Sequence, residues 1–400
     1  MNFKLLSADT LKAYVKDYKV TLKAYVKDHK VISAILFVGL GLTMLRFTLG
    51  IAGVSNLDDN TPWGFWMSFD LLCGVALSAG GCAVAAAYHV FGIRHFGPQV
   101  RAALATAFLG YFFEVVALQY EVGQPWRLVY PLFWSPGTRS ALFLVGLCVF
   151  LYLIVLFIEL LPALFEYLGM RTRRTAAVHW SVHLAVAGAV IAIIHQSALG
   201  SLYLIAQPKV HPLWYSDFMP VLFLISSIFA GLCMVIIEGI LAHKYLKKYM
   251  DEQHIKNADK VVLSCGNAVF LLMISYLFIR IVNLIADDNI QYLTTGYGMW
   301  FLVEIIGFVA LPVFLLFIGT REKRIRLVKI SAIITVLGVM LNRFNVSIIA
   351  FNYNLPPDER YSPSWMEIFI SVFLVTLLLL AYRLMCAKMP ILKEHDDYTG

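Results

Sequence analysis

The sequence has little charge and no region typical of a water-soluble domain. Only 14% of its 400 residues are charged, 60% are hydrophobic, and the mean hydropathy is +0.76. No soluble domain of this size exposes such a surface to water. Apart from the first 30 residues, the stretches between apolar runs have about 20 residues or fewer, too short for a packed core. The composition therefore indicates an all-α integral membrane protein.

Cysteine is scarce and is never paired in the sequence. The six Cys residues include no C-x-x-C pair, and nearly all fall in apolar stretches. Iron–sulfur clusters need grouped thiolates, so we expect neither an iron–sulfur cluster nor another metal site in this chain. Free buried Cys residues that act as small hydrophobes are the simpler interpretation.

What the sequence does contain is ten long apolar stretches. A spanning helix needs about 20 mainly apolar residues. The ten stretches that qualify are 31–52, 64–92, 102–121, 140–168, 176–206, 217–242, 262–286, 297–319, 327–349 and 364–386. We therefore predict a ten-helix transmembrane domain over residues 31–386, preceded by a cytoplasmic segment (1–30) and followed by a cytoplasmic tail (387–400).

The distribution of Lys and Arg predicts the orientation of these helices. With the N-terminus inside, the outer loops hold only four of the 32 basic residues, Arg127, Arg139, Lys209 and Arg360. Basic residues accumulate on the cytoplasmic side, so we expect both termini to be cytoplasmic. This topology accounts for the net charge of +7, which gives no reason to expect nucleic acid as a partner.

The first 30 residues predict an amphipathic helix. LKAYVKDYKV from Leu11 and LKAYVKDHKV from Leu22 are eleven residues apart, which returns a helix to almost the same face. This Lys-rich face either contacts anionic lipid or is simply solvated. The following apolar run has no small-residue cleavage site, so we expect an uncleaved anchor.

His195, Gln196 and Ser197 interrupt the apolar stretch 176–206 and are its most informative residues. Ionisable and amide side chains at bilayer depth are costly, so they normally face a protein interior, a cavity or a ligand. Counting about 1.5 Å per residue puts His195 roughly 16 Å below the outer end of its helix. We therefore expect a functional site in the outer half of the membrane.

Six further charged residues share this outer half. By the same count, each lies about 9 to 10 Å below the outer end of its helix. They are Asp70, Glu114, Glu304, Arg46, Arg280 and Arg343. Because buried membrane charges usually pair, an ion pair with an Arg explains any single acid. A ligand cavity is the better explanation of the whole set.

A second polar group lies towards the inner side and includes two acids beside helix-disturbing residues. Glu159 precedes Pro162 and Glu238 precedes Gly239, where an irregular helix can admit water. Together with Glu114, Glu159 and Glu238 form a candidate proton pathway from the cytoplasm to the outer cavity. The alternative is that both acids extend to the inner interface.

Two other function classes remain open. A haem b protein that carries electrons itself needs two His ligands at matched depth, which His89 with His179 or His183 satisfies only loosely. A secondary transporter also builds its site from buried charges, but with Gly- or Pro-interrupted helices in corresponding halves. Gly80-Gly81 has no such counterpart later in the chain.

Five segments resemble the NrfD/polysulfide-reductase membrane family, and within it the ten-helix integral membrane subunit of the [NiFe]-hydrogenase-2 type, the so-called cytochrome b subunit. The segments are PWGFWMSFDLLCG from Pro62, IELLPALFEYLG from Ile158, HQSALGSL from His195, HPLWYS from His211 and NRFNVSIIAFN from Asn342. They cover most of the chain in consistent order, and HQSALGSL with the following HPLW is fairly specific.

The resemblance implies two four-helix bundles with flanking helices and a quinone-reactive anchor without a redox centre of its own. It also implies a periplasmic ferredoxin-like subunit with a [4Fe-4S] cluster, and a further catalytic subunit of the hydrogenase, multihaem cytochrome or molybdoenzyme type. The positions that it marks as polar are Asp70, Tyr111, His195, Glu238, Arg280, Glu304 and Arg343. In one departure, this chain has Leu144 where the relatives carry a Glu, and we take Glu114 as the substitute.

These observations lead to the hypothesis that a menaquinone or ubiquinone headgroup enters the outer half and hydrogen-bonds His195, with Tyr111 or Gln196 as a second donor. Quinone reduction or quinol oxidation moves two electrons and two protons, and His exists in both protonation states near neutral pH. The chain would then be one subunit of a respiratory oxidoreductase complex.

The charged residues receive supporting roles in this hypothesis. Asp70 or Glu304 orients His195 or relays its proton, and Glu114 serves the proton route. Arg280 and Arg343 are expected to keep the carboxylates ionised and, as part of the quinone-binding site, to favour the semiquinone or quinol anion by charge.

Overall fold

The computed structural model describes residues 29–58, 61 and 63–393. The predicted amphipathic segment and the end of the tail, residues 394–400, lie outside these ranges. Within the described residues, ten helices are long and apolar enough to cross a membrane, which confirms the predicted number. They are α2 (Lys30–Leu49), η2–α3–α4 (Met67–Cys73, Gly74–Ser78 and Gly80–His89), α5 (Gly97–Glu121), α7 (Ala141–Tyr167), α9 (Ser181–Ile205), α10 (Met219–Tyr245), α11 (Glu252–Ala286), α12–η8–α13 (Gly296–Leu302, Val303–Ala310 and Leu311–Arg321), α14–η9 (Ile325–Phe344 and Asn345–Ile349) and α15 (Trp365–Lys388).

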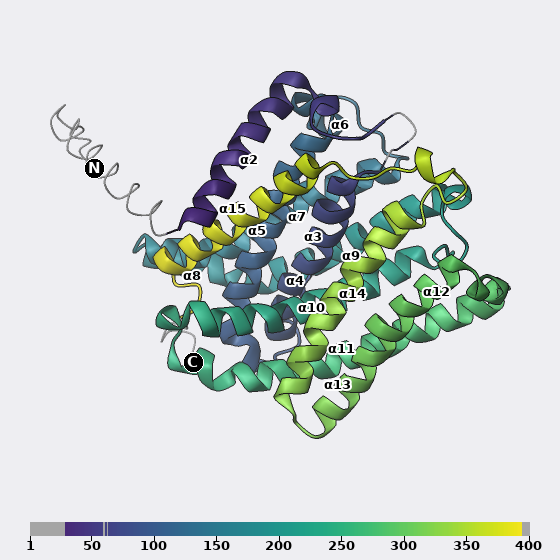
Figure 1. Ribbon diagram of the computed structural model, residues 1–400. Helices are drawn as coiled ribbons and strands as arrows, with labels where there is room; N and C mark the ends of the chain where they lie inside the picture. Colours follow the sequence, from purple (N-terminus) through teal and green to yellow (C-terminus); the bar gives the residue numbers. More distant parts are fainter. Residues whose placement is uncertain (1–28, 59–60, 62, 394–400) are drawn as a thin grey trace.

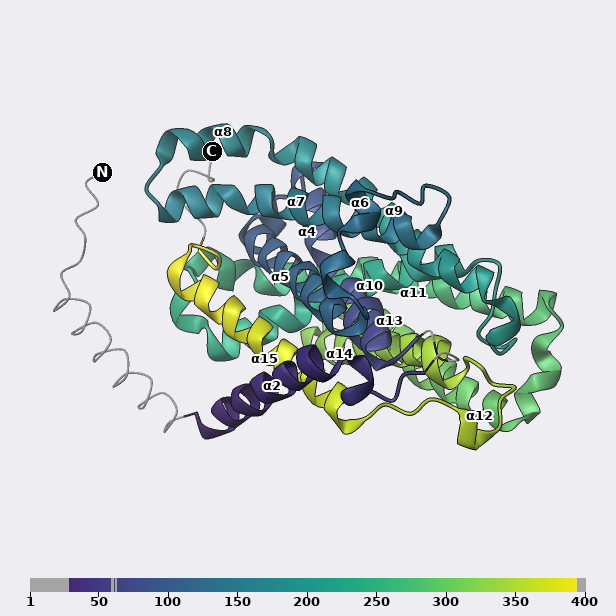
Figure 2. The same cartoon turned by 90° about the horizontal axis from the view of Figure 1, so that it is seen from above.

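The helices form two groups of four with a flanking pair (Figures 1 and 2). The first group consists of η2–α3–α4, α5, α7 and α9, which pack together. The second group consists of α10, α11, α12–η8–α13 and α14–η9. Within it, α10 and α13 each pack against α11 and α14. The two groups meet where α10 contacts α3, α4 and α9. Helices α2 and α15 pack against each other, and α15 also contacts α5. This is the arrangement that the sequence led us to expect.

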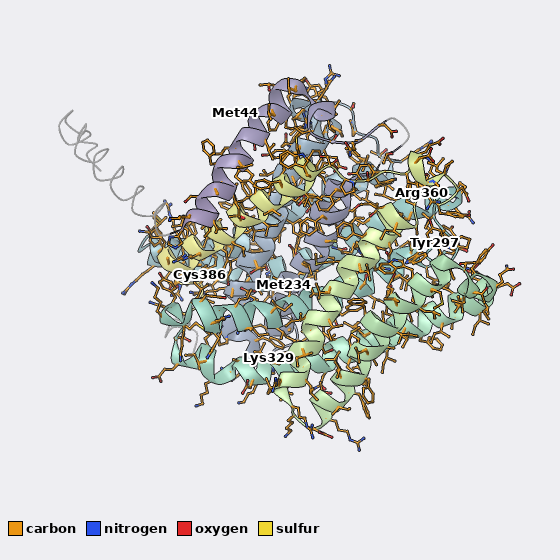
Figure 3. The ribbon with its side chains drawn as sticks, in the orientation of Figure 1. Met44, Met234, Tyr297, Lys329, Arg360 and Cys386 are labelled. Carbon is orange, nitrogen blue, oxygen red and sulfur yellow. The ribbon has the colours of Figure 1, made fainter. Side chains whose placement is uncertain are left out.

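The two ends of the molecule differ in their loops. Loops 206–218, 287–295 and 350–364 meet at one end, called here the loop-rich end, where Val210 pairs with Phe351 and Arg360 donates to the Tyr297 hydroxyl at 2.7 Å. The opposite end, called the basic end, has short connections and includes Lys329 (Figure 3). The charge bias predicts that the loop-rich end is the outer side.

Three helices begin five or more residues away from the predicted starts. Helix α5 begins at Gly97, five residues before the predicted 102. Helix α9 begins at Ser181, because Trp180 separates it from the short helix α8 (Arg171–His179). Helix α11 begins at Glu252, ten residues before the predicted 262, and the Asp251 side chain caps it by accepting from His254 N at 2.7 Å. Polar first turns with a good cap extend a helix beyond its apolar stretch.

The two bundles cross closely at a pair of glycines. A methyl group added to Gly80 on α4 or to Gly231 on α10 would collide with the backbone of the other helix. Small residues allow such close crossings in membranes. Gly80 is therefore explained by packing between the bundles and needs no transport role.

Candidate functional site

Glu114 on α5 is a buried acid without a hydrogen-bond partner. Its side chain is 2% exposed, and neither carboxyl oxygen has a partner among the residues that the structure describes. A buried polar group without a partner is costly, and an ionised one far more so. Such a group is retained where a ligand or water completes its bonding.

A cavity of about 230 Å³ lies next to the Glu114 carboxyl group. Residues of η2, α3, α5, α10, α14 and α15 line it, and it is partly open to the surface. Met234, in its wall, lies near the centre of the molecule (Figure 3). The lining residues are mostly apolar: Phe69, Asp70, Cys73, Gly74, Leu77, Ser78, Thr106, Gly110, Phe113, Glu114, Met234, Met340, Leu374, Val375, Leu378 and Leu379. A pocket that is largely apolar with a few polar groups is typical of a ligand site.

Asp70 is the second carboxyl group at this cavity. It lies in η2, a π-helical turn, and accepts a hydrogen bond from Ser371 Oγ of α15 at 2.7 Å. Short π-helical turns occur frequently at functional sites. The structure thus brings together Asp70 and Glu114, two of the predicted acids, at a single cavity.

His195 and Tyr111 form a second buried polar cluster. The Tyr111 hydroxyl and His195 Nδ1 lie 3.0 Å apart, and both side chains are 0% exposed. Among the described residues, His195 Nε2 has no hydrogen-bond partner, whereas Gln196 interacts with Tyr111 and Tyr152 with Cys82. The Tyr111 and Tyr152 rings meet edge to face at 4.6 Å. This cluster has an unused ring nitrogen, as a proton-transfer site requires.

The two clusters are neighbours, but they do not share a wall. His195 does not line the Glu114 cavity, whereas Gly110, next to Tyr111, does. Tyr111 and Glu114 are three residues apart on α5 and so lie on the same side of that helix. Tyr111 is therefore the link between His195 and the cavity, and the expected direct contact of His195 with the cavity is not seen.

Glu304, the third predicted acid, is held by three donors. Trp214 Nε1 and Asn342 Nδ2 donate to its two oxygens at 2.7 Å each, and Asn345 Nδ2 donates as well. The space beside it has a volume of only about 10 Å³. Both carboxyl oxygens of Glu304 thus have hydrogen-bond donors. Glu304 therefore ties α12–η8–α13 to α14–η9 and to the loop at Trp214.

The three membrane arginines do not pair with acids. Arg343 lies 3.7 Å from the Phe223 ring centre and donates to Ser226 Oγ at 2.7 Å. Arg280 donates to Leu213 O at 3.1 Å, and Arg46 donates to Tyr120 O at 2.6 Å. No salt bridge joins them to an acid within the described ranges. Direct ion pairs of Arg280 and Arg343 with Asp70 or Glu304 are therefore not seen in the described residues, and uncharged oxygens and aromatic rings contact their guanidinium groups instead.

Glu238 and Glu159 occupy separate places nearer the basic end. Tyr382 on α15 donates to Glu238, and Thr106, which lines the cavity, also interacts with it. Glu159 lines a small polar cavity of about 60 Å³ with His89. Glu238 is thus connected to the Glu114 cavity, and Glu159 is not part of that connection.

The histidines considered for haem do not form a haem site. His89 borders the cavity of about 60 Å³, which is far smaller than a porphyrin ring. His179 and His183 are exposed, and both pack against Trp180. These residues do not fit a bis-His haem.

Several residues of the two sites carried no separate signal in the sequence. Ser371, Tyr382, Thr106 and Tyr152 are single hydroxyl groups in apolar helices and are common in such helices. Trp214, Asn342 and Asn345 were visible only as parts of the HPLW and NRFN segments. Their shared position around Glu304 could not be derived without the packing of the second bundle.

Comparison with known proteins agrees with this picture. The polysulphide reductase, NrfD family model matches residues 53–353. A protein of Nitratidesulfovibrio vulgaris is 54% identical over 364 residues, covering 91% of this chain and 94% of the relative. The probable Ni/Fe-hydrogenase 2 b-type cytochrome subunit of Escherichia coli is 31% identical, with 89% of this chain and 90% of the relative covered. The menaquinone reductase, integral membrane subunit, of N. vulgaris is 25% identical, with 90% and 91% covered.

Proposed function

The chain belongs to the NrfD family of polysulphide reductase membrane proteins, and on this premise we propose that it is the quinone-reactive membrane subunit of a respiratory oxidoreductase. It passes electrons between an iron–sulfur subunit on the outer side and the menaquinone or ubiquinone pool. Relatives named as a menaquinone reductase subunit and a hydrogenase subunit support this proposal.

The observation that carries the proposal is the unpartnered Glu114 carboxyl group at the wall of an apolar cavity of about 230 Å³. A quinone headgroup is apolar on its faces and polar only at two carbonyl oxygens. An apolar cavity that is partly open to the apolar surface at Val375 and Leu379, with one unused carboxyl group, suits this chemistry. Glu114 then exchanges a proton with one quinone oxygen, while Asp70, fixed by Ser371, orients the headgroup.

Reduction of a quinone to a quinol takes up two electrons and two protons, so a second proton-exchanging group is required. His195 and Tyr111 supply it in this proposal. The Tyr111 hydroxyl bonds His195 Nδ1 at 3.0 Å, which leaves His195 Nε2 free for water or proton exchange. Tyr111 is a positioning residue that joins His195 to the cavity wall.

Protons reach the cavity from the basic end through Glu238. Its partners are Tyr382 and the cavity residue Thr106, so the Glu238 carboxyl group connects Thr106 at the cavity with Tyr382 on α15. Glu159, with its own small polar cavity, serves the His195 cluster through Tyr152. Because the protons come from one side and the electrons from the other, quinone reduction by this route moves charge across the membrane.

The loop-rich end is the proposed docking side for a periplasmic ferredoxin-like subunit that carries a [4Fe-4S] cluster. A further catalytic subunit, of the hydrogenase, multihaem cytochrome or molybdoenzyme type, completes the complex. The membrane in this proposal is the cytoplasmic membrane of a bacterium or archaeon. The chain itself supplies the quinone site and no redox centre.

Filling the cavity tests the proposal without removing a polar group. A side chain added at Gly74 meets no atom within 4 Å, and Gly74 lines the cavity. Gly74→Leu is therefore expected to raise the KM for a short-chain quinone analogue about tenfold or more, or to abolish turnover, in the purified complex. Gly146→Leu is the matched control, because Gly146 is exposed on α7 and a side chain there also meets nothing. Equal kinetics for the two variants would reject this cavity as the quinone site.

A further inference from the structure

The connection between α5 and α7 carries a row of exposed aromatic residues. It contains η4 (Pro125–Arg127) and the short helix α6 (Tyr130–Phe133). Large apolar side chains are exposed at positions 126, 129, 130, 133 and 134, a spacing that falls on one helical face. The most exposed are Trp126 at 68% and Trp134 at 69%.

Other aromatic residues at the loop-rich end are buried and hold loops together. His211 is surrounded by the rings of Trp214, Tyr292, Tyr297 and Tyr353, with centroids 4.7 to 5.7 Å away. Burial lowers the pKa of His211, and its Nδ1 accepts from Leu213 N at 3.2 Å. The aromatic face of residues 126–134 has no comparable role within the chain.

The position of α6 along α7 gives the depth of this face. Phe133 packs edge to face with Phe150 at 5.9 Å, and α6 contacts α7, as Figures 1 and 2 also show. Phe150 is nine residues, or about 14 Å, below the first residue of α7. Helix α7 has 27 residues, about 40 Å, and exceeds the hydrocarbon core by about 10 Å. Phe150 therefore lies about 4 to 9 Å inside the hydrocarbon core, in the shallow part of the acyl-chain region.

The exposed face continues into a surface that contacts lipid. Phe150, Ile154 and Phe157 are exposed along the membrane-spanning helix α7. The connection 122–140 has two Arg and no acidic residue, and the Arg127 guanidinium lies 5.9 Å from the Tyr130 ring centre. Trp and Tyr favour the membrane interface, and Arg suits phosphate groups there.

We propose that residues 126–134 are an interfacial anchor whose Trp126 and Trp134 rings rest in the phospholipid leaflet at the loop-rich end. The segment holds the end of α5, and thus the helix that carries Tyr111 and Glu114, at a fixed depth. This inference is independent of the quinone assignment.

Quenching by brominated lipid tests the proposal directly. The full complex is reconstituted in phosphatidylcholine brominated at shallow or deep acyl positions, and the quenched tryptophan emission is compared between the wild type and Trp126→Phe/Trp134→Phe. The double variant keeps the aromatic face, so it should fold and assemble. We expect a clear loss of the quenched component, largest with the shallow bromines. Trp365→Phe is the positive control, because Trp365 is 62% exposed at the start of spanning helix α15.

Three outcomes would overturn the proposal. An unchanged quenched component in the double variant means that neither ring reaches lipid. Quenching of the two rings by aqueous acrylamide instead of bromine means that the segment faces water. If both quenchers fail to reach the rings in the full complex, but reach them once the associated subunits are removed, the face binds protein.

Discussion

Glu114 and Glu304 are acids buried to almost the same extent, at 2% and 1% exposure, one in each bundle. Three side-chain donors from three segments surround Glu304, whereas Glu114 has none among the described residues. The space beside Glu304 is about 10 Å³, and that beside Glu114 is about 230 Å³. A buried charge that is fully bonded serves the fold, and a buried polar group left unbonded beside a cavity costs stability and is available for chemistry.

The largest expected effect is on stability and distinguishes the two acids. Glu304→Leu leaves Trp214, Asn342 and Asn345 without their acceptor, and each buried unpaired donor costs about 1 to 3 kcal/mol. We expect a loss of several kcal/mol or failure to assemble. Glu114→Leu removes a group that has no bond to lose and should change stability by less than about 1 kcal/mol. Thermal unfolding in detergent, followed by tryptophan fluorescence, measures both, and equal losses would remove the distinction.

The next largest effect is on activity, and here Glu114 is expected to matter more than Glu304. Glu114→Gln keeps the shape but cannot exchange a proton, so quinone turnover should fall about 100-fold, within the usual range for loss of a general acid–base group. Assembly should be normal. Glu322→Gln is the control, since Glu322 only bonds Arg324 in an exposed pair at the basic end. Wild-type turnover in Glu114→Gln would remove this residue from the mechanism.

His195 and Tyr111 are expected to give an effect of similar or smaller size. His195→Ala should abolish most quinone-linked electron transfer while assembly remains intact. Tyr111→Phe removes only the hydroxyl that bonds His195 and should lower turnover about tenfold, with a shifted pH profile as the sign of a positioning role. Steady-state kinetics across pH with a quinone analogue measure both variants. Unchanged turnover in His195→Ala would contradict the assignment.

The smallest effect on turnover is expected for Glu238. Glu238→Gln in proteoliposomes should lose the coupling of turnover to pH or membrane voltage before it loses redox activity. Tyr382→Phe, which removes the donor to Glu238, should weaken the same coupling more mildly. A voltage-sensitive dye and a pH-sensitive dye give the two readouts. Equal coupling in mutant and wild type would reject the route through Glu238.

The sequence was sufficient for the fold because hydropathy reports burial in lipid directly. Ten apolar stretches predicted ten helices, and the errors lie at helix starts. Helices α5 and α11 extend beyond their apolar stretches, whereas α9 begins later than predicted because Trp180 separates it from α8. Residues that share a depth could also be identified, which is why Asp70 and Glu114 were expected together. Depth alone, however, does not give the direction in which a side chain points around its helix axis, and so does not give its neighbours.

That missing direction explains the errors at the site. Glu304 and Asp70 lie at similar predicted depths, yet they belong to different clusters. Arg280 and Arg343 were expected to face acids, but they bond Leu213 O and Ser226 on neighbouring segments. Ser371 and Tyr382 on α15 lacked any signal, because a single hydroxyl group in an apolar helix does not reveal which groove the helix covers.

The central claim is that the Glu114 carboxyl group contacts the quinone, and infrared difference spectroscopy tests it most directly. Addition of a non-reducible quinone analogue to the oxidised complex should shift a protonated carboxyl C=O band, and this band should be missing from Glu114→Gln and retained in Glu322→Gln. A shift that is identical in wild type and Glu114→Gln, or no shift at saturating analogue, would contradict the account.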